Sequence, residues 1–216
     1  MAKTQSLDEM IGKKAGEFAD QVRRTAAIAV KEEEIRIEVE RQLAFLEQAT
    51  GVRLEGKQEF TVAKGRIDSF YTRVLIEYKN PSSPADRLGP RLDSPGSKKV
   101  VEQIKSRFRG LKDELGQPLG SLFGVGCDGK HFIFVRFRDQ KWQVEEPVEV
   151  NKTSTERFLW ALYNLGEKGK PFQPEYLAGD FGAMEGSIAT EGIHALYDAI
   201  STTNHPKAQT DRKSVV

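Results

Sequence analysis

The stretch KGRIDSFYTRVLIEYK (residues 64–79) decides the fold class. Polar and apolar residues alternate at Arg66–Asp68 within the expected strand Arg66–Tyr71, and after a short turn the chain enters the more continuously apolar run Val74–Lys79. A period of two is typical of β-strands, and short polar segments between such runs are typical of hairpin turns. Glu59–Ala63 has the same pattern before the Lys64-Gly65 turn, so the sequence predicts a meander of three strands.

Amphipathic helices are predicted on both sides of this meander. Across residues 6–50 the spacing of apolar residues is helical, with interruptions expected near Gly12 and Gly16. The clearest part of this stripe consists of residues three or four apart: Ile28, Glu32, Ile35, Val39, Leu43 and Leu46. After a loop with four prolines at 81–97, Lys98–Leu115 carries a second apolar stripe and is predicted to be a helix.

The rest of the pattern adds two strands and a last helix. Asp128-Gly129 is a strong hairpin signal between Ser121–Cys127 and Lys130–Phe137, and Trp142–Val150 is compatible with a further strand. Thr153–Leu165 has helical periodicity, with its first Thr or the following Ser as the expected cap. The resulting order of elements predicts an α/β fold with a central mixed β-sheet flanked by helices.

Length and composition narrow the class of protein further. We expect residues 1–170 to form one domain, and residues 171–216 to form a connector, a short helix near Ile188–Ile200 and a polar tail. With 33 Lys and Arg against 32 Asp and Glu, and 38% hydrophobic residues, the chain is not a disordered polyelectrolyte. It has no run of about 18 apolar residues, no apolar signal segment and one cysteine, so we expect a cytoplasmic protein that makes no membrane contact.

Two carboxylates and one ammonium are predicted to meet on the second and third strands of the meander. If the hairpin register places Asp68 beside Glu77, the two carboxylates repel each other and are costly to desolvate, unless a cation joins them. An oxygen-rich site favours Mg²⁺, with Mn²⁺ as a substitute. Lys79, on the same face as Glu77, would then position or help deprotonate a water that attacks a phosphodiester.

The ordinary alternative for these residues is a solvated ion pair across two strands. The run VLIEYK is nearly continuous in apolar residues, however, which indicates a buried central strand. Charges that interrupt a buried strand are usually paired or functional, so the sequence favours a metal site.

Glu32 is predicted to point the same way, because it falls at the centre of the apolar stripe on a helical wheel. The alternative is a partly exposed Glu32 whose long side chain reaches solvent. On this interpretation Glu38 and Glu40 are simple surface charges.

The helix over residues 98–115 adds polar and basic residues near this site. Gln103 and Arg107 lie one turn apart on the flank of its apolar stripe, where they would reach a bound phosphate or orient Glu77; the alternative is that they are plain boundary residues. Residues 79–112 contain nine Lys and Arg against three Asp and Glu, an excess of six that suits a phosphate backbone. The residues expected to contact nucleic acid are Arg107, Lys98, Lys99, Arg87 and Arg91.

Gly65–Asp68 (GRID) followed by Val74–Lys79 (VLIEYK) resembles the PD-(D/E)XK nuclease superfamily, with Ile67 in place of the family's proline. The resemblance implies a restriction-endonuclease-like core with the order helix–strand–strand–strand–helix–strand. It also implies that Asp68, Glu77 and the backbone carbonyl of Tyr78 bind Mg²⁺. Lys79 would assist the attacking water, and Glu32 would be the acid of the first helix. Gln103–Arg107 resembles the Gln-x-x-x-Tyr/Arg element of nuclease domains in large restriction enzymes, which completes the expected catalytic set Asp68, Glu77, Lys79, Glu32 and Gln103.

Pro174–Gly182 resembles the connector that follows the amino-terminal nuclease domain in fused restriction–modification enzymes. No methyltransferase motif is present in the sequence. The resemblance therefore implies a DNA endonuclease module that works with the methyltransferase or specificity region of a larger enzyme, or as a homodimer.

Two other interpretations stay open at this point. The first is a catalytically inactive nuclease fold that binds DNA, whose carboxylates would bind no divalent metal. The second is a protein-interaction domain in which Glu77 and Lys79 are exposed in surface ion pairs and Glu32 lies far from both.

Overall fold

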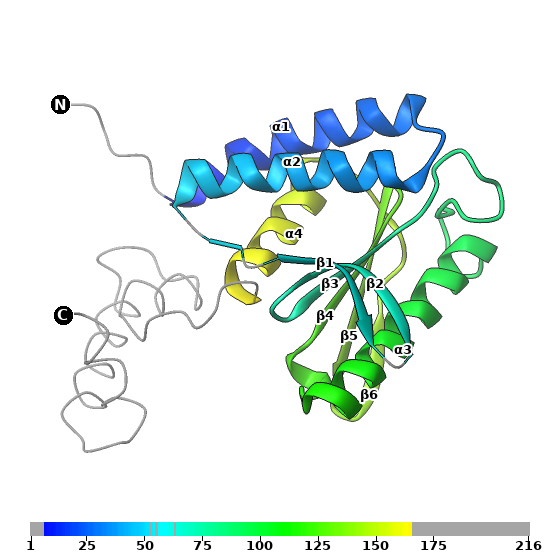
Figure 1. Cartoon of the computed structure of the whole chain (residues 1–216). Coiled ribbons are helices and arrows are strands. Elements are labelled where there is room, and N and C mark those ends of the chain that lie inside the picture. The colour runs from blue at the N-terminus through cyan, green and yellow to red at the C-terminus, as the bar shows by residue number, and fades with distance from the viewer. Residues whose placement is uncertain (1–6, 52, 55, 63, 166–216) are drawn as a thin grey trace, which may run out of the picture. The chain divides into compact units, whose positions relative to one another are not determined.

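The computed structural model describes residues 7–51, 53–54, 56–62 and 64–165, and within them it is an α/β fold built on one central mixed sheet. Four helices and seven strands follow one another in the order α1, α2, β1–β3, α3, β4–β7, α4 (Figure 1). The predicted connector, the helix near Ile188–Ile200 and the polar tail lie outside the described residues.

The predicted meander forms one half of the sheet. The strands β1 (Gly56–Val62), β2 (Gly65–Tyr71) and β3 (Val74–Tyr78) pair antiparallel in that order. Gly65 has a φ of +114°, a conformation that favours glycine and lets the chain reverse between the first two strands. β3 is buried at all five positions, which agrees with its nearly continuous apolar sequence.

The second half of the sheet begins with β4 (Phe123–Cys127), which pairs parallel to β3. A helix, α3 (Pro95–Leu115), makes the crossover between these two strands, as a parallel pair requires. β5 (His131–Arg138), β6 (Lys141–Val144) and the short β7 (Val148–Glu149) complete the sheet, with β6 and β7 both paired to β5. The stretch expected to form one strand, Trp142–Val150, is thus divided between β6 and β7.

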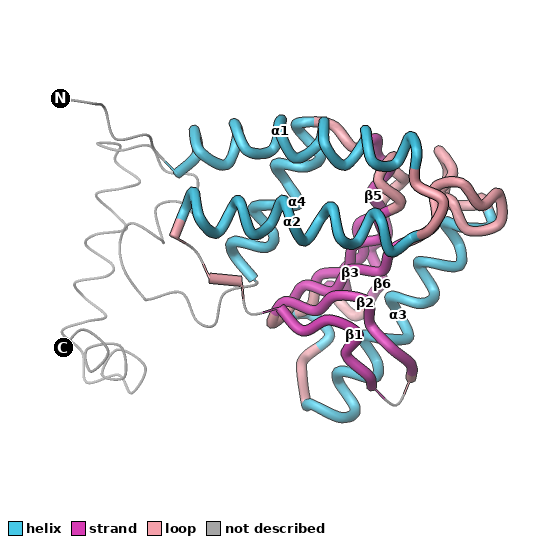
Figure 2. The backbone as a smooth tube through the Cα atoms, turned by 45° about the horizontal axis from the view of Figure 1, so that its top comes forward, coloured by secondary structure: helices cyan, strands magenta, loops and turns pink. Residues whose placement is uncertain are grey.

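The two faces of the sheet bury different helices, as Figures 1 and 2 show. On one face Ile104 and Phe108 of α3 pack with Leu75, Ile133 and other apolar residues in a single core cluster. On the other face Phe132, next to Ile133 and therefore pointing the opposite way, stacks against Phe158 of α4 (Lys152–Leu165), with ring centroids 5.3 Å apart. Each such fully buried side chain contributes roughly 1.5–3 kcal/mol, so both layers are needed to hold the sheet.

The amino-terminal region forms two helices rather than the one long pattern expected. α1 (Leu7–Ile28) runs unbroken through Gly12 and Gly16, and α2 (Glu32–Thr50) starts after a three-residue connection. Ile28 is 82% exposed and takes no part in the stripe of α2. The physical reason is length: one straight helix over 45 residues would extend about 65 Å and could not cover so small a sheet. Folding back packs α1 against α2 and against α4.

Two smaller expectations are also wrong. Glu38 and Glu40 are not simple surface charges, because Glu38 is 6% exposed and bonds to Gln42, while Glu40 accepts a hydrogen bond from Ser69 at 3.0 Å. The cap of α4 is Asn151, whose Oδ1 accepts from the Ser154 amide. Among the described helices, none is long and apolar enough to cross a membrane.

Candidate functional site

The β2–β3 hairpin brings Asp68 and Glu77 to one place. Ser69 pairs with Ile76 in the antiparallel register, so Asp68 and Glu77 face each other at the next step, where the ladder opens. The Tyr78 amide, which no longer has a strand partner on that side, donates to Asp68 Oδ2 at 2.8 Å. The hydrogen bond to the Asp68 carboxylate, one of the predicted site residues, therefore holds the end of β3 against β2.

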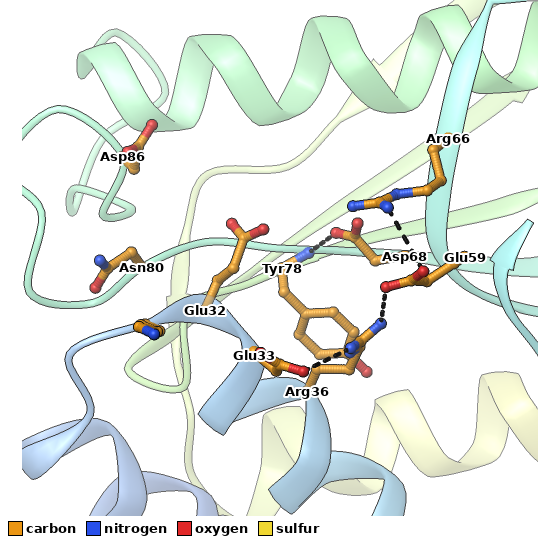
Figure 3. A pocket seen from close by; sticks show the side chains of 10 residues that line it. Glu32, Glu33, Arg36, Glu59, Arg66, Asp68, Tyr78, Asn80 and Asp86 are labelled. Atoms are coloured by element: carbon orange, nitrogen blue, oxygen red, sulfur yellow. Dashed lines mark hydrogen bonds and ion pairs between the residues drawn. The ribbon is translucent and has the colours of Figure 1, made fainter. Parts of the chain in front are cut away.

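A cleft of about 360 Å³ opens over this end of β3. Its walls bring together most of the predicted site residues with two that were not predicted; they are Glu32, Arg66, Asp68, Glu77, Lys79, Asp86, Lys99, Gln103 and Arg107. A hollow of about 400 Å³ shares Glu32, Arg66, Asp68 and Asp86 with it, and Figure 3 shows that hollow. Residues from helices on both faces of the sheet and from two strands thus meet at the end of the central strand β3.

Glu32 reaches the cleft from the first turn of α2, not from the middle of a helical stripe. The connection before it is held to the loop after β3, because Asn80 Nδ2 donates to the Val30 carbonyl at 2.8 Å and Ser82 Oγ donates to the Ala29 carbonyl. In Figure 3 the Glu32 carboxylate extends from the start of α2 toward the strand that carries Tyr78.

Glu77 is the most strongly perturbed carboxyl of the cleft. It is 2% exposed, and this burial raises its pKa to about 7, with the nearby Asp68 carboxylate adding to the rise. Arg107 and Lys79 oppose that shift, and Arg107 Nε lies 3.4 Å from Glu77 Oε1.

Glu32 is exposed by comparison, yet partial desolvation at the cleft wall raises its pKa as well. The positive charge of Lys79 lowers it, whereas the carboxylates of Asp68 and Asp86 raise it further. The Glu32 carboxyl is therefore influenced by these three charged groups, which line the same cleft.

Lys79 is buried at the floor of the cleft, with 5% of its surface exposed. Its Nζ donates to the Tyr78 carbonyl at 2.5 Å, and its backbone amide donates to Cys127 of the neighbouring strand. The carbonyl expected to bind a metal is thus already an acceptor for the lysine expected to handle the water.

Arg107 acts as an internal brace in this structure. Its Nε donates to the Arg66 carbonyl at 2.9 Å, and its Nη1 donates to the Lys64 carbonyl. Combined with its ion pair to Glu77, these bonds make Arg107 orient the site, which is one of the two roles expected for it. Gln103 lines the same wall, and its Oε1 is buried without a hydrogen-bond partner.

Of the four other residues predicted to contact nucleic acid, one lines the cleft and three do not. Lys99 is on the cleft wall, where it forms an ion pair with Asp86 at 2.6 Å. Lys98, Arg87 and Arg91 are exposed and do not line the cleft. Sequence reasoning overlooked Arg66 and Asp86 as cleft residues. Arg66 could have been found, because it lies two residues before Asp68 on β2 and therefore on the same face of the strand. Asp86 lies in a proline-rich loop, where apolar residues have no regular spacing.

Within the described part of the chain, no three side chains of His, Cys, Asp or Glu cluster closely enough to hold a metal ion. Asp68 and Glu77 nevertheless form a pair of hard oxygen donors, and Glu77 Oε1 is buried without a hydrogen bond. Mg²⁺ commonly takes only one or two carboxylates and completes its shell with water and substrate phosphates. The donors present therefore fit Mg²⁺.

The geometry differs from the one expected of a protein-interaction domain. That interpretation required exposed Glu77 and Lys79 with Glu32 far away, whereas both are buried and all three line one cleft. No family model, curated protein or solved structure matches this chain, so the residues themselves must carry the functional argument.

Proposed function

We propose that this chain is a magnesium-dependent DNA endonuclease domain with a restriction-endonuclease-like core, the cleavage module of a restriction–modification system. One observation carries the proposal: Asp68 of β2 lies beside Glu77 and Lys79 at the end of the buried strand β3, and these three residues line one cleft with Glu32, Gln103 and Arg107. Holding the buried Glu77 carboxylate beside the half-buried Asp68 carboxylate costs stability, and a cation that joins them would offset this cost.

In this proposal Asp68 and Glu77, with the Tyr78 carbonyl, hold Mg²⁺. The ion would stabilise the negative charge that develops on the phosphate during hydrolysis. Arg107 holds Glu77 in place, while Arg66 and Lys99 present positive charge to the DNA backbone at the open side of the cleft.

Lys79 has the task of holding the attacking water. One of its three ammonium protons is directed to the Tyr78 carbonyl, so two remain to orient a water in the cleft. Glu32 faces the same space from α2, and its raised pKa suits a group that exchanges a proton with that water.

The test is cleavage of supercoiled plasmid DNA with Mg²⁺, with structured RNA as a second substrate. We expect Asp68→Ala and Lys79→Ala each to reduce cleavage by about a hundredfold or more. Asp20→Ala and Lys13→Ala are matched controls, because both residues are exposed on α1 and lie outside the cleft. Cleavage that survives in either cleft variant, with the fold intact by circular dichroism, would refute the mechanism.

A second candidate is a DNA-binding module of the same fold that has lost catalysis. Lys79 already bonded to the Tyr78 carbonyl, and the absence of a three-ligand cluster among the described residues, favour it. Calorimetric titration with Mn²⁺ separates the two: heat that disappears in Asp68→Ala supports the enzyme, and no heat in either protein supports the inactive module.

A further inference from the structure

A second cavity, of about 500 Å³, lies at the opposite end of the sheet from the cleft. It opens where β3 and β4 begin, since Arg73 precedes β3 and Phe123 is the first residue of β4. Its lining includes four arginines from three separate segments, the turn before β3, the strand β5 and the helix α4: Arg73, Arg136, Arg138 and Arg157. No carboxylate is among the described residues that line it.

Among the described residues, the charge of this cavity is only partly balanced. Arg157 forms a two-pronged ion pair with Glu145, with Nη1 at 2.5 Å from Oε2. The other three arginines form no ion pair with any described residue. Three guanidinium groups therefore share one hollow without a carboxylate in contact with them from the described residues, although the Glu145 carboxylate also acts on Arg136 from a distance.

Arg136 is the residue of the cavity whose geometry points most clearly to an anionic ligand. Its guanidinium stacks on the Phe123 ring, 4.6 Å from the centroid, which fixes the plane of its donors. Its Nε is shielded from solvent and has no hydrogen-bond partner. A buried charged donor that nothing accepts is costly, and such groups are rare unless a ligand satisfies them.

The other walls are also fixed in advance. The Arg157 guanidinium lies over the Phe134 ring at 4.5 Å, so this donor too is held by stacking as well as by its ion pair. Trp160 of α4 lines the cavity and contacts Tyr163 edge to face, which leaves an aromatic wall beside the arginines. Burial and the charges of Arg138 and Arg157 lower the pKa of Arg136, a repulsion that an anion would relieve.

We propose that this cavity binds a ligand with two or more adjacent phosphate groups. Planar guanidinium forks match phosphate oxygens in pairs, and three unpaired positive charges suit a polyanion better than a single carboxylate. The phosphates belong either to a free nucleoside polyphosphate or to successive nucleotides of a nucleic-acid strand, with the aromatic wall beside the base in both cases. This inference does not depend on the endonuclease proposal, because none of its residues lines the cleft.

The experiment is isothermal titration calorimetry of the full chain with pyrophosphate, in low salt and with EDTA to exclude metals. We expect binding with a Kd below about 1 mM, and a weakening of at least about tenfold in Arg73→Ala/Arg138→Ala. Both residues are exposed, so the double variant should keep its fold, which circular dichroism checks. Arg23→Ala/Arg24→Ala is the matched control, because it removes the same charge from exposed positions on α1 and should leave the affinity unchanged.

Further arms identify the source of the phosphates. ATP that binds more tightly than pyrophosphate, with no binding of tetrathymidylate, supports a free nucleotide; the reverse supports a nucleic-acid strand. The proposal is overturned if citrate binds as tightly as pyrophosphate, if no phosphate compound binds at about 10 mM, or if the two double variants lose affinity equally.

Discussion

The two ends of the sheet treat charge in opposite ways. The cleft at the carboxyl end of β3 has four acidic and four basic residues in its walls, and its cations have acceptors within the protein. The cavity at the other end contains four arginines, and among the described residues a carboxylate forms an ion pair with Arg157 alone of these four. In the cleft the charges are balanced, and the unfavourable electrostatic free energy is concentrated at one group, the buried Glu77 carboxyl. In the arginine cavity the unfavourable free energy is repulsion among like charges, so loss of a cation should have opposite effects on stability at the two ends.

The largest effect is expected from Glu77→Gln. If the cleft is an endonuclease site, the variant should lose about a thousandfold in plasmid cleavage. It should also be more stable than the wild type at pH 8, by up to about 3 kcal/mol, because a buried carboxyl with a raised pKa favours the folded state only while it is protonated.

The direction of this stability difference can be checked by urea denaturation at several pH values. The stabilising contribution of protonated Glu77 is complete below its unfolded pKa of about 4.3 and is lost as the pH rises through about 7. The variant should lack that loss, whereas Asp20→Asn should follow the wild type. If the difference in the free energy of unfolding between wild type and variant did not change with pH, the raised pKa of Glu77 would not be the cause of the destabilisation.

A smaller effect is expected from Gly65→Ala, which tests the brace behind the cleft. Gly65 has a φ of +114°, and a Cβ there would lie 2.2 Å from Arg107 Nη1. The substitution should therefore lower the free energy of unfolding by about 2 kcal/mol and displace Arg107 from Glu77.

Gly16→Ala is its control, because nothing lies within 4 Å of that position in α1. There alanine should stabilise the helix by about 0.5–1 kcal/mol. Equal effects at the two glycines in urea denaturation would mean that the turn carries no strain and that Arg107 is free to move.

The smallest effect compares one cation from each end. Arg138→Gln should raise the free energy of unfolding by about 0.3 kcal/mol, because it relieves repulsion among exposed arginines. Lys99→Gln should lower it, because the Asp86 carboxylate loses its ammonium partner. The two shifts should vanish in about 1 M NaCl, where screening acts within about 3 Å. Shifts of the same sign in low salt would contradict the contrast between the two ends.

Local pattern predicted a large part of this fold. The meander, the helix after the proline-rich loop and the Asp128-Gly129 hairpin all have periods or turn residues that a short window contains. The convergence of Asp68, Glu77 and Lys79 followed from the register of a single hairpin. Their chemistry stays a prediction, because proximity in a cleft does not itself demonstrate catalysis.

What could not be predicted depends on contacts between distant segments. The break between α1 and α2 has no proline or glycine, and only the need to cover a small sheet reveals it. The half-buried hydrogen bond of Glu40 depends on Ser69, which is 29 residues away. The arginine cavity draws on four separate segments, so no spacing along the chain could indicate it.

Asp128 illustrates a further property of the hairpin. Its Oδ1 accepts from the Lys130 and His131 amides within its own turn, whereas its Oδ2 accepts from the Leu88 amide in the loop that carries Asp86. An asparagine would keep the turn but present an amide donor to the Leu88 amide, also a donor. If this turn were grafted onto another protein, the loop that contains Leu88 would have to be grafted with it. The two segments are therefore structurally coupled, although Leu88 and Asp128 are 40 positions apart in the sequence.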